Sequence, residues 1–284
     1  MKIPQRFELS NLILGATLLA SFSLVAHAAP EEVSYLIDLN SKTAKEIGSL
    51  AGGDTYATGI NDSGQIVGYS QVGRHFHAFI TDFGGGAIRD LGTLGSYSTV
   101  ANDINDAGQV AGYSRTPSGD YHPFITGDNG GPMKDLGTLD GLHSQARGVN
   151  ENGQVVGWSD TPDMVIRHAF ITGPDGGEMK DLGTLGGLVS QANAINDAGQ
   201  VVGWSYMSGD STEHAFVTGL GGVGLTDLNT LFALPHGVIL TEAVDINDRG
   251  QVIVIASIPE PQTYAMLLAG FGLIGFMTYR RRSM

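Results

Sequence analysis

The sequence predicts an all-β protein, a five-bladed β-propeller built from repeats of about 45 residues. Three observations predict this fold. A turn motif occurs five times, two strand motifs follow its first four copies at nearly constant spacing, and each end of the repeat region holds a half-repeat. A period near 45 residues is the length of a four-stranded propeller blade, so each repeat is expected to form one blade.

The turn motif reads Ile-Asn-Asp-Ser-Gly-Gln-Ile-Val-Gly-Tyr-Ser at residues 60–70, and a weaker copy starts at Ile246. Asn-Asp-x-Gly between apolar residues predicts a hairpin turn, because Gly and Asn tolerate positive φ. The β-branched and aromatic run that follows it is typical of a strand. The full copies lie at residues 60–70, 104–114, 149–159 and 195–205.

Two further motifs complete each repeat. His-Ala-Phe, or His-Pro-Phe in one copy, begins at His77, His122, His168 and His214. Asp-Leu-Gly-Thr-Leu begins at Asp90, Asp135 and Asp181, and at Asp227 with Asn229 in place of Gly. Each repeat therefore offers four short strands. The predicted units span about 54–95, 96–140, 141–186 and 187–231.

The two ends of the repeat region are complementary. Residues 35–39 align with Ala-Phe-Ile-Thr and residues 46–53 with Asp-Leu-Gly-Thr-Leu-Gly-Gly, which are the last two strands of a repeat. Residues 243–256 supply only the first two strands. We expect segments 33–53 and 241–256 to form one split blade that closes the ring and removes exposed strand edges. An open β-solenoid is the alternative, but it does not need complementary half-repeats.

The N-terminus has the layout of a secretory signal peptide. Lys2 and Arg6 precede an apolar run from residue 12 to 26, and the small residues Ala26 and Ala28 flank His27. This order predicts a signal peptide over residues 1–28, cleaved after Ala28. The expected partners are the Sec translocon and signal peptidase. A short N-terminal anchor is the alternative.

The C-terminus carries a second targeting pattern. Pro259, Glu260 and Pro261 precede a nearly uncharged run, and a basic cluster closes it. Residues 263–279 predict a transmembrane helix of about 25 Å. A basic end favours the cytoplasmic side of a membrane, so the bulk of the chain would lie outside. The basic cluster consists of Arg280, Arg281 and Arg282.

Residues 258–284 resemble the PEP-CTERM sorting signal of Gram-negative bacteria. The resemblance implies recognition by an exosortase, a membrane cysteine protease that would cleave near Pro259-Glu260-Pro261. It also implies an inner-membrane intermediate that is passed on towards the cell surface or the exopolysaccharide. An ordinary C-terminal membrane anchor is the alternative.

The repeats at residues 33–256 resemble the HAF-repeat family of bacterial extracellular proteins. The sequence departs from that pattern at Pro123, at Asn229 and in the last repeat, where Val254-Ile255 replaces Gly-Trp or Gly-Tyr. The resemblance implies a propeller-like extracellular domain over residues 29–257, and it implies no defined reaction.

Composition and charge exclude several functions. The chain has no Cys, so it holds no disulfide, zinc-thiolate site or Cys nucleophile. Residues 29–257 contain 10 Lys plus Arg and 27 Asp plus Glu, a net charge of −17. A nucleic acid would be repelled by this surface, whereas cations, neutral glycans and basic proteins remain possible partners.

Two metal hypotheses follow from the motifs, although no cofactor is predicted. The four repeated His side chains could ring a common axis and bind a transition metal, or each could instead hydrogen-bond within its own blade. Residues 103–108 and 245–250 resemble a calcium loop only in part, because Ala107 or Arg249 stands where an oxygen ligand is needed. The four His residues are His77, His122, His168 and His214.

The predicted function is a non-catalytic module that binds a glycan or a protein and is linked to exopolysaccharide. Loops 115–121, 160–167 and 206–213 vary most and are the expected binding loops. A propeller hydrolase or lyase acting on polysaccharide is the alternative. The aromatic residues Tyr69, Tyr113, Trp158 and Trp204 occupy one position per repeat, where they pack between blades or present a sugar-stacking platform.

Overall fold

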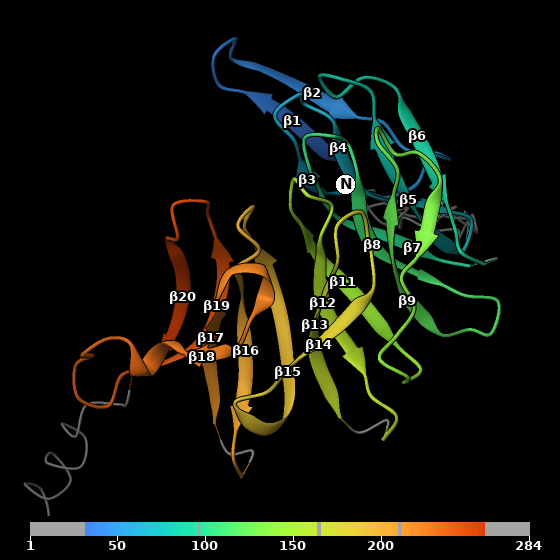
Figure 1. The fold of residues 1–284 in the computed structure, drawn as a ribbon. Helices are drawn as coiled ribbons and strands as arrows, with labels where there is room; N and C mark the ends of the chain where they lie inside the picture. The colour runs from blue at the N-terminus through green and yellow to red at the C-terminus, as the bar shows by residue number, and fades with distance from the viewer. Residues whose placement is uncertain (1–31, 96, 164–165, 210–211, 259–284) are drawn as a thin grey trace, which may run out of the picture. The chain divides into compact units, whose positions relative to one another are not determined.

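The computed structural model describes residues 32–258, apart from Ser96, 164–165 and 210–211. Twenty strands and two single-turn 3₁₀ helices make up this part of the chain, which confirms the all-β prediction (Figure 1). The helices are η1 (Leu220–Gly222) and η2 (Leu228–Thr230).

The targeting segments lie outside the described residues. These are the signal peptide 1–28 with Ala26 and Ala28, the Pro-Glu-Pro motif at 259–261, the predicted helix 263–279 and the Arg cluster at 280–282. Within the part of the chain that the structure describes, no helix is long and apolar enough to cross a membrane.

Four units of the chain each fold into four antiparallel strands paired in chain order. In the third and fourth units a short parallel contact between Arg167 and Val189 joins the two sheets. The first unit holds β3 (Thr55–Ile60), β4 (Ile66–Val72), β5 (His75–Thr81) and β6 (Ile88–Gly92), and the second β7 (Thr99–Ile104), β8 (Val110–Arg115), β9 (Tyr121–Thr126) and β10 (Met133–Asp135). The third holds β11 (Ser144–Val149), β12 (Val155–Asp160), β13 (Arg167–Thr172) and β14 (Met179–Gly183), and the fourth β15 (Gly186–Ile195), β16 (Val201–Met207), β17 (Glu213–Thr218) and β18 (Leu225–Asp227).

The two ends of the described chain form separate hairpins. β1 (Ser34–Asp38) pairs with β2 (Thr43–Ile47), and β19 (Ile239–Ile246) pairs with β20 (Val252–Ser257). No strand pairing joins the two hairpins in residues 32–258, so the split blade stays a prediction.

The register of the first hairpin differs by one residue from the sequence alignment. Tyr35 pairs with Glu46 in the same way that Phe79 pairs with Asp90. Tyr35 is therefore the counterpart of Phe79, whereas the alignment matched it with the preceding Ala. The error arose because β1 lacks the His-Ala-Phe motif that marks the register elsewhere.

The apolar core lies between successive units. Val67 and Ile80 of the first unit pack against Ala101 and Ile104 of the second in one buried cluster. The same arrangement recurs between the second and third units and between the third and fourth. Phe at the third motif position is fully buried in all four units, at Phe79, Phe124, Phe170 and Phe216. Because each core is shared by two units, a single unit cannot bury its own apolar face.

Serine hydroxyls add a polar link between units. The backbone N–H of Leu94, at the exit of the first unit, donates to Ser114 Oγ of the second at 2.9 Å. Ser114 is fully buried and also contacts Thr99 Oγ1 at 3.0 Å. Equivalent bonds from the Leu of each exit loop reach the Ser of the next unit, at Leu50–Ser70, Leu139–Ser159 and Leu185–Ser205. The Asp-Leu-Gly-Thr-Leu motif therefore places this Leu N–H against the following unit.

The Gly of the second strand allows two strands to approach closely. A Cβ on Gly112 would lie 2.0 Å from the carbonyl oxygen of Val100, which no side chain can accept. In the last repeat Val254 stands at this position. There Val254 pairs with Ala243, as Gly112 pairs with Ala101, and β19 contains a second register shift between Leu240 and Glu242.

Candidate functional site

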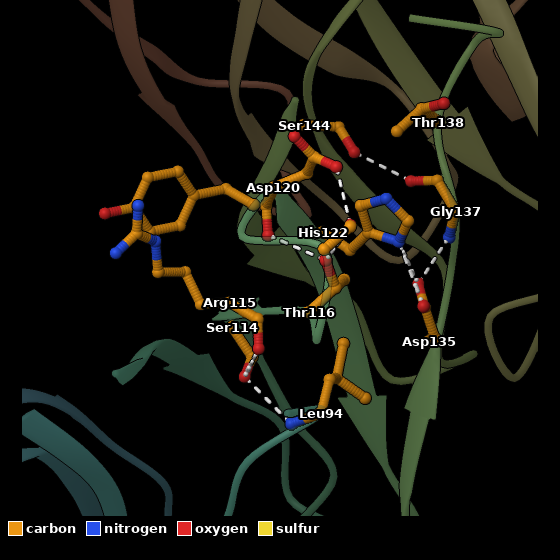
Figure 2. A network of polar contacts seen from close by, with 12 residues as sticks. Leu94, Ser114, Arg115, Thr116, Asp120, His122, Asp135, Gly137, Thr138 and Ser144 are labelled. Carbon is orange, nitrogen blue, oxygen red and sulfur yellow. Dashed lines mark hydrogen bonds and ion pairs between the residues drawn. The ribbon is translucent and has the colours of Figure 1, made fainter. Parts of the chain in front are cut away.

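The repeated His residues are held by the repeated Asp residues of the same unit. His122 Nδ1 lies 2.9 Å from both carboxylate oxygens of Asp135, and Asp135 Oδ1 also accepts the backbone N–H of Gly137 (Figure 2). The other pairs have Nδ1–carboxylate distances of 2.7–2.8 Å, at His77–Asp90, His168–Asp181 and His214–Asp227. Each pair links the third strand of a unit to the end of its fourth strand.

This contact shifts the titration of the second unit's pair. The hydrogen bond with Asp135 raises the pKa of His122, although burial opposes the shift. Burial alone would raise the pKa of Asp135, but the His122 and Gly137 hydrogen bonds lower it below the ordinary value. The pair is partly exposed, so its net effect on stability is about 1 kcal/mol or less.

The structure brings each His to a carboxylate rather than to the other His residues. The four pairs occur once in each of four units, and each Nδ1 is engaged by its Asp. In residues 32–258, with their gaps, no three His, Asp or Glu side chains gather in a way that holds a metal ion. Each of these His side chains therefore hydrogen-bonds within its own unit, which is one of the two arrangements expected from the motif.

The Asn-Asp turns form a ladder from unit to unit. Asn61 Nδ2 donates to the carbonyl oxygen of Asn105 at 3.1 Å, while Asn61 Oδ1 accepts the backbone N–H of Gln65. The same amide bond to the next unit's Asn carbonyl recurs at 3.0–3.2 Å for Asn105, Asn150 and Asn196. The same side chain therefore closes its own turn and joins it to the turn of the next unit.

A ladder of carboxylates accompanies the amides. The backbone N–H of Asp62 donates to Asp106 Oδ1 at 2.9 Å, and that of Asp106 donates to Glu151 Oε1 at 2.9 Å. The series continues from Glu151 to Asp197 and from Asp197 to Asp248. Burial, followed by the neighbouring carboxylates, raises the pKa of Glu151. The sequence did not reveal this ladder, although the repeated acidic residue after each Asn was its signal.

The leading carboxylates of the two segments that resemble a calcium loop in part, residues 103–108 and 245–250, accept hydrogen bonds from the backbone. Asp103 Oδ1 accepts the N–H of Ile104 and Oδ2 accepts the N–H of Val149, both at 2.9 Å. Asp245 accepts the N–H of Ile246. Both carboxylates thus bind backbone N–H groups. Burial raises the pKa of Asp103 to about 6, against the two hydrogen bonds, which lower it.

A polar pocket lies along the first strands of successive units. Its volume is about 420 Å³, and it is lined by Asn102, Tyr113, Gln145, Arg147, Asn193, Glu242 and Val244. These residues come from β7, β8, β11, β15 and β19, and neighbouring first strands contact one another. The pocket therefore gathers side chains that are distant in sequence.

A β-bulge in each first strand places these side chains. The register shifts between Ala101 and Asp103 in β7, and again between Ala146 and Gly148 in β11. The residue inside each bulge is Asn102 or Arg147, both of which line the pocket. Bulges re-aim side chains in this way, and they often lie beside binding sites.

The repeated aromatic position is used mainly for packing. The Tyr69 ring stacks on Tyr56 with centroids 4.9 Å apart, and Trp204 contacts Tyr206. Trp158 is buried, with the Arg167 guanidinium 3.5 Å from the centre of its ring. Only Tyr113 of this set lines the polar pocket.

A second pocket, of about 460 Å³, involves one of the predicted binding loops. Thr161, Pro162, Asp163 and Ile166 line it together with the His168–Asp181 pair. Its lining is largely apolar, and the His–Asp pair within it is the one that every unit repeats. This pocket therefore carries less specific chemistry than the polar pocket.

A family model described as the PEP-CTERM protein-sorting motif matches residues 257–282. The match confirms the prediction of this sorting signal at the C-terminus. The chain thus carries the signal of an exported protein that an exosortase processes. A search of curated proteins found no similar sequence.

Solved structures with a similar fold include putative TolB from Agrobacterium tumefaciens. Its TM-score is 0.55 at 10% sequence identity, over 80% of this chain and 83% of that chain. TolB from Acinetobacter baumannii has a TM-score of 0.47 at 14% identity, over 67% of this chain and 48% of that chain. Dipeptidyl peptidase 4 from Porphyromonas gingivalis has a TM-score of 0.48 at 13% identity, over 69% and 29%. The first likeness shows an all-β fold similar to the TolB β-propeller.

Asp103 predicts a specific pH dependence of stability. Its folded pKa of about 6 lies above the ordinary Asp value of about 3.9, so its contribution is present below pH 4 and is lost as pH rises through 6. We expect the free energy of unfolding to fall by roughly 2–3 kcal/mol between pH 4 and 7.5 on account of this group. Urea denaturation of wild type and Asp103→Asn at several pH values measures this contribution. It is the difference between the two proteins in the slope of the free energy of unfolding against pH.

The matched control is Asp128→Asn, which removes an exposed carboxylate from the same unit. Its pH slope should equal that of wild type. Equal slopes for wild type and Asp103→Asn would contradict the assignment.

Proposed function

We propose that this exported, exosortase-processed protein is a non-catalytic binding module of the cell surface or extracellular matrix, with a glycan or a protein as its ligand. The observation that carries the proposal is the polar pocket on the first strands. It combines carboxamide, guanidinium, phenol and carboxylate groups, which is the chemistry that binds hydroxyl-rich or charged ligands.

The targeting signals support a location at the cell surface or outside the cell. In this proposal signal peptidase cleaves after Ala28, following export by the Sec translocon. Helix 263–279 then holds the chain in the inner membrane until an exosortase cleaves near Pro259-Glu260-Pro261. The link to exopolysaccharide and the HAF-repeat character of residues 33–256 belong to the same proposal.

The distribution of chemistry along the repeats favours binding over catalysis. The His–Asp pairs recur in every complete unit, as a structural element does, whereas a catalytic site usually uses residues that one unit alone supplies. The residues that break the repeat lie in the polar pocket, at Arg147 and Glu242. A polysaccharide hydrolase or lyase remains the alternative that the experiment must separate.

The experiment is a pull-down of the full-length protein with the exopolysaccharide of its host and, in a second arm, with the surface proteins of its host. We expect the protein to bind while the polysaccharide keeps its length and gains no new reducing or unsaturated ends. Shortened polysaccharide would contradict the non-catalytic function and would favour a polysaccharide hydrolase or lyase. Failure to bind either polysaccharide or any surface protein would overturn the proposal.

We also propose that the terminal hairpins complete a fifth blade. The support is a set of side chains that are buried in complete units and exposed in the half-units. Ile253 is 64% exposed, but its counterpart Val67 is fully buried. Tyr35 is 53% exposed, and its counterpart Phe79 is fully buried. Pairing of the two hairpins in a fifth blade would bury both of these side chains.

The face that a closing blade would cover is also open. Ile60 of the first unit is 56% exposed, whereas Ile104, its counterpart in the second unit, is 6% exposed. An apolar pocket of about 350 Å³ lies there, lined in part by Leu36, Ala57 and Ile60. In the second unit the equivalent surface is covered by Val67, the counterpart of Ile253. Ile253 therefore has a matching apolar site within the same chain.

The register of this closure is set by the first unit, where Val67 pairs with Ile80. The equivalent pair is Ile253 with Leu36, so β20 should pair antiparallel with β1. Because the chain has no Cys, the double variant Ile253→Cys with Leu36→Cys should form one intramolecular disulfide under mild oxidation. Mass spectrometry of the oxidised monomer measures the link.

The control slips the register by one residue, with Ile253→Cys and Tyr35→Cys. Neighbouring strand positions face opposite sides of the sheet, so this pair should stay reduced. Equal oxidation of both pairs, no oxidation of the first pair, or links only between two chains would each contradict the closing blade.

A further inference from the structure

The bulged position of the first strands normally donates a hydrogen bond to the next unit. Thr58 Oγ1 donates to the carbonyl oxygen of Ala101 at 2.9 Å, and Asn102 Nδ2 donates to that of Ala146 at 2.6 Å. Asn193 Nδ2 continues the pattern to the carbonyl oxygen of Ala243 at 2.9 Å. The first, second and fourth units therefore use a short polar side chain at this position as a link.

Arg147 occupies the same position in the third unit and departs from the pattern. No hydrogen bond or ion pair joins its guanidinium to another residue in the described part of the chain. The side chain is exposed and lines the polar pocket. A group that links units elsewhere is here replaced by a long cation that faces the pocket.

The pocket offers further unengaged polar groups around this cation. The Gln145 amide has no hydrogen-bond partner in the described residues, and it lies two residues from Arg147 on β11. Glu242 Oε1 accepts from Asn193 Nδ2 at 2.9 Å, which leaves Oε2 as an acceptor. Asn102 uses its amide nitrogen for Ala146, which leaves its carbonyl oxygen. The site thus combines hydrogen-bond donors and acceptors suited to sugar hydroxyls.

The charge of Arg147 is unusual in its surroundings. Residues 29–257 carry a net charge of −17, yet Arg147 is the single cationic side chain among the residues that line this pocket. Burial lowers the pKa of Arg147, while Glu242 opposes the shift. A guanidinium with unoccupied donors favours a planar anion that it can bind through two parallel hydrogen bonds.

Two more arginines are held on aromatic rings next to this site. Arg115 lies 5.4 Å from the ring centre of Tyr121, and Tyr121 contacts the pocket residue Tyr113. Arg167 stacks on Trp158, whose partner across the β11–β12 pair is Gln145. Arg167 also forms an ion pair with Asp160 at 3.7 Å, whereas Arg147 has no carboxylate partner in the described residues.

We propose that Arg147 binds the carboxylate of a uronic acid residue in a polysaccharide, while Gln145, Asn102 and Glu242 hydrogen-bond its hydroxyl groups. The inference rests on the proposed binding function and names its ligand class. The volume of about 420 Å³ lies in the range of small-ligand pockets and admits one sugar residue with part of a neighbour.

The experiment is calorimetric titration of the full-length protein with tetragalacturonate, and with a neutral galactose tetrasaccharide for comparison. We expect the wild type to prefer the uronate. Arg147→Gln should weaken uronate binding by about tenfold or more, because a charged hydrogen bond is lost. Arg147→Lys should recover only part of the affinity, because an ammonium lacks the paired donors of a guanidinium.

Arg249→Gln is the matched control, since it removes one exposed cation that does not line the pocket and should leave binding unchanged. Thermal unfolding of each variant shows that the fold is kept. Equal uronate binding by wild type and Arg147→Gln, or a preference for the neutral sugar, would overturn the inference. Wild-type protein that binds the host exopolysaccharide but no tetragalacturonate would also overturn it, and would leave the proposed function standing.

Discussion

Each unit of this protein completes its polar and apolar contacts only through the next unit. The Asn amide of one turn reaches the Asn carbonyl of the following turn, as Asn61 does with Asn105. The Leu94 N–H at the end of one unit requires Ser114 of the next. The apolar clusters are shared in the same way. No buried side-chain nitrogen or oxygen lacks a hydrogen-bond partner in the described residues. The hydrogen bonds between units therefore help to satisfy the buried polar groups.

The same constraint builds the candidate site. Because neighbouring first strands must lie close enough to exchange these bonds, their bulged residues come together along one pocket. The repeated residues make these bonds, whereas several positions on the first strands differ from unit to unit. Arg147 and Glu242 occupy such positions, where the other units carry different side chains. A repeated framework with a few non-repeated side chains can thus acquire a specific ligand without loss of its core.

Much of the fold was accessible from the sequence, because the repeat period and the turn chemistry act locally. The four-stranded units follow from motifs at His77 and Asp90 and from the Asn-Asp turn at Asn61. The His122–Asp135 contact also agrees with the blade-hydrogen-bond reading of the motif. The register of β1 was off by one residue, because the half-repeat there keeps the strand pattern but not the His-Ala-Phe motif.

The site was less accessible, because it depends on which strands lie side by side. Sequence reasoning pointed to loops such as 115–121, whereas the polar pocket lies on the strands. Arg147 had no motif to mark it, since its significance appears only when its neighbours Asn102 and Asn193 are seen to bond to the next unit. The β-bulge that re-aims these side chains cannot be predicted from the alternation of apolar and polar residues along a strand.

Cooperative unfolding of the units is the direct measure of their mutual dependence, and the chain contains suitable probes. Its two tryptophans, Trp158 and Trp204, lie at equivalent positions of the third and fourth units. The variants Trp204→Phe and Trp158→Phe each keep one of them as a reporter of a single unit. In urea, the fluorescence transition of each variant should coincide with its own far-ultraviolet circular dichroism transition, because no unit is stable without the next. A fluorescence transition that separates from the circular dichroism transition in either variant would contradict the dependence of each unit on its neighbour.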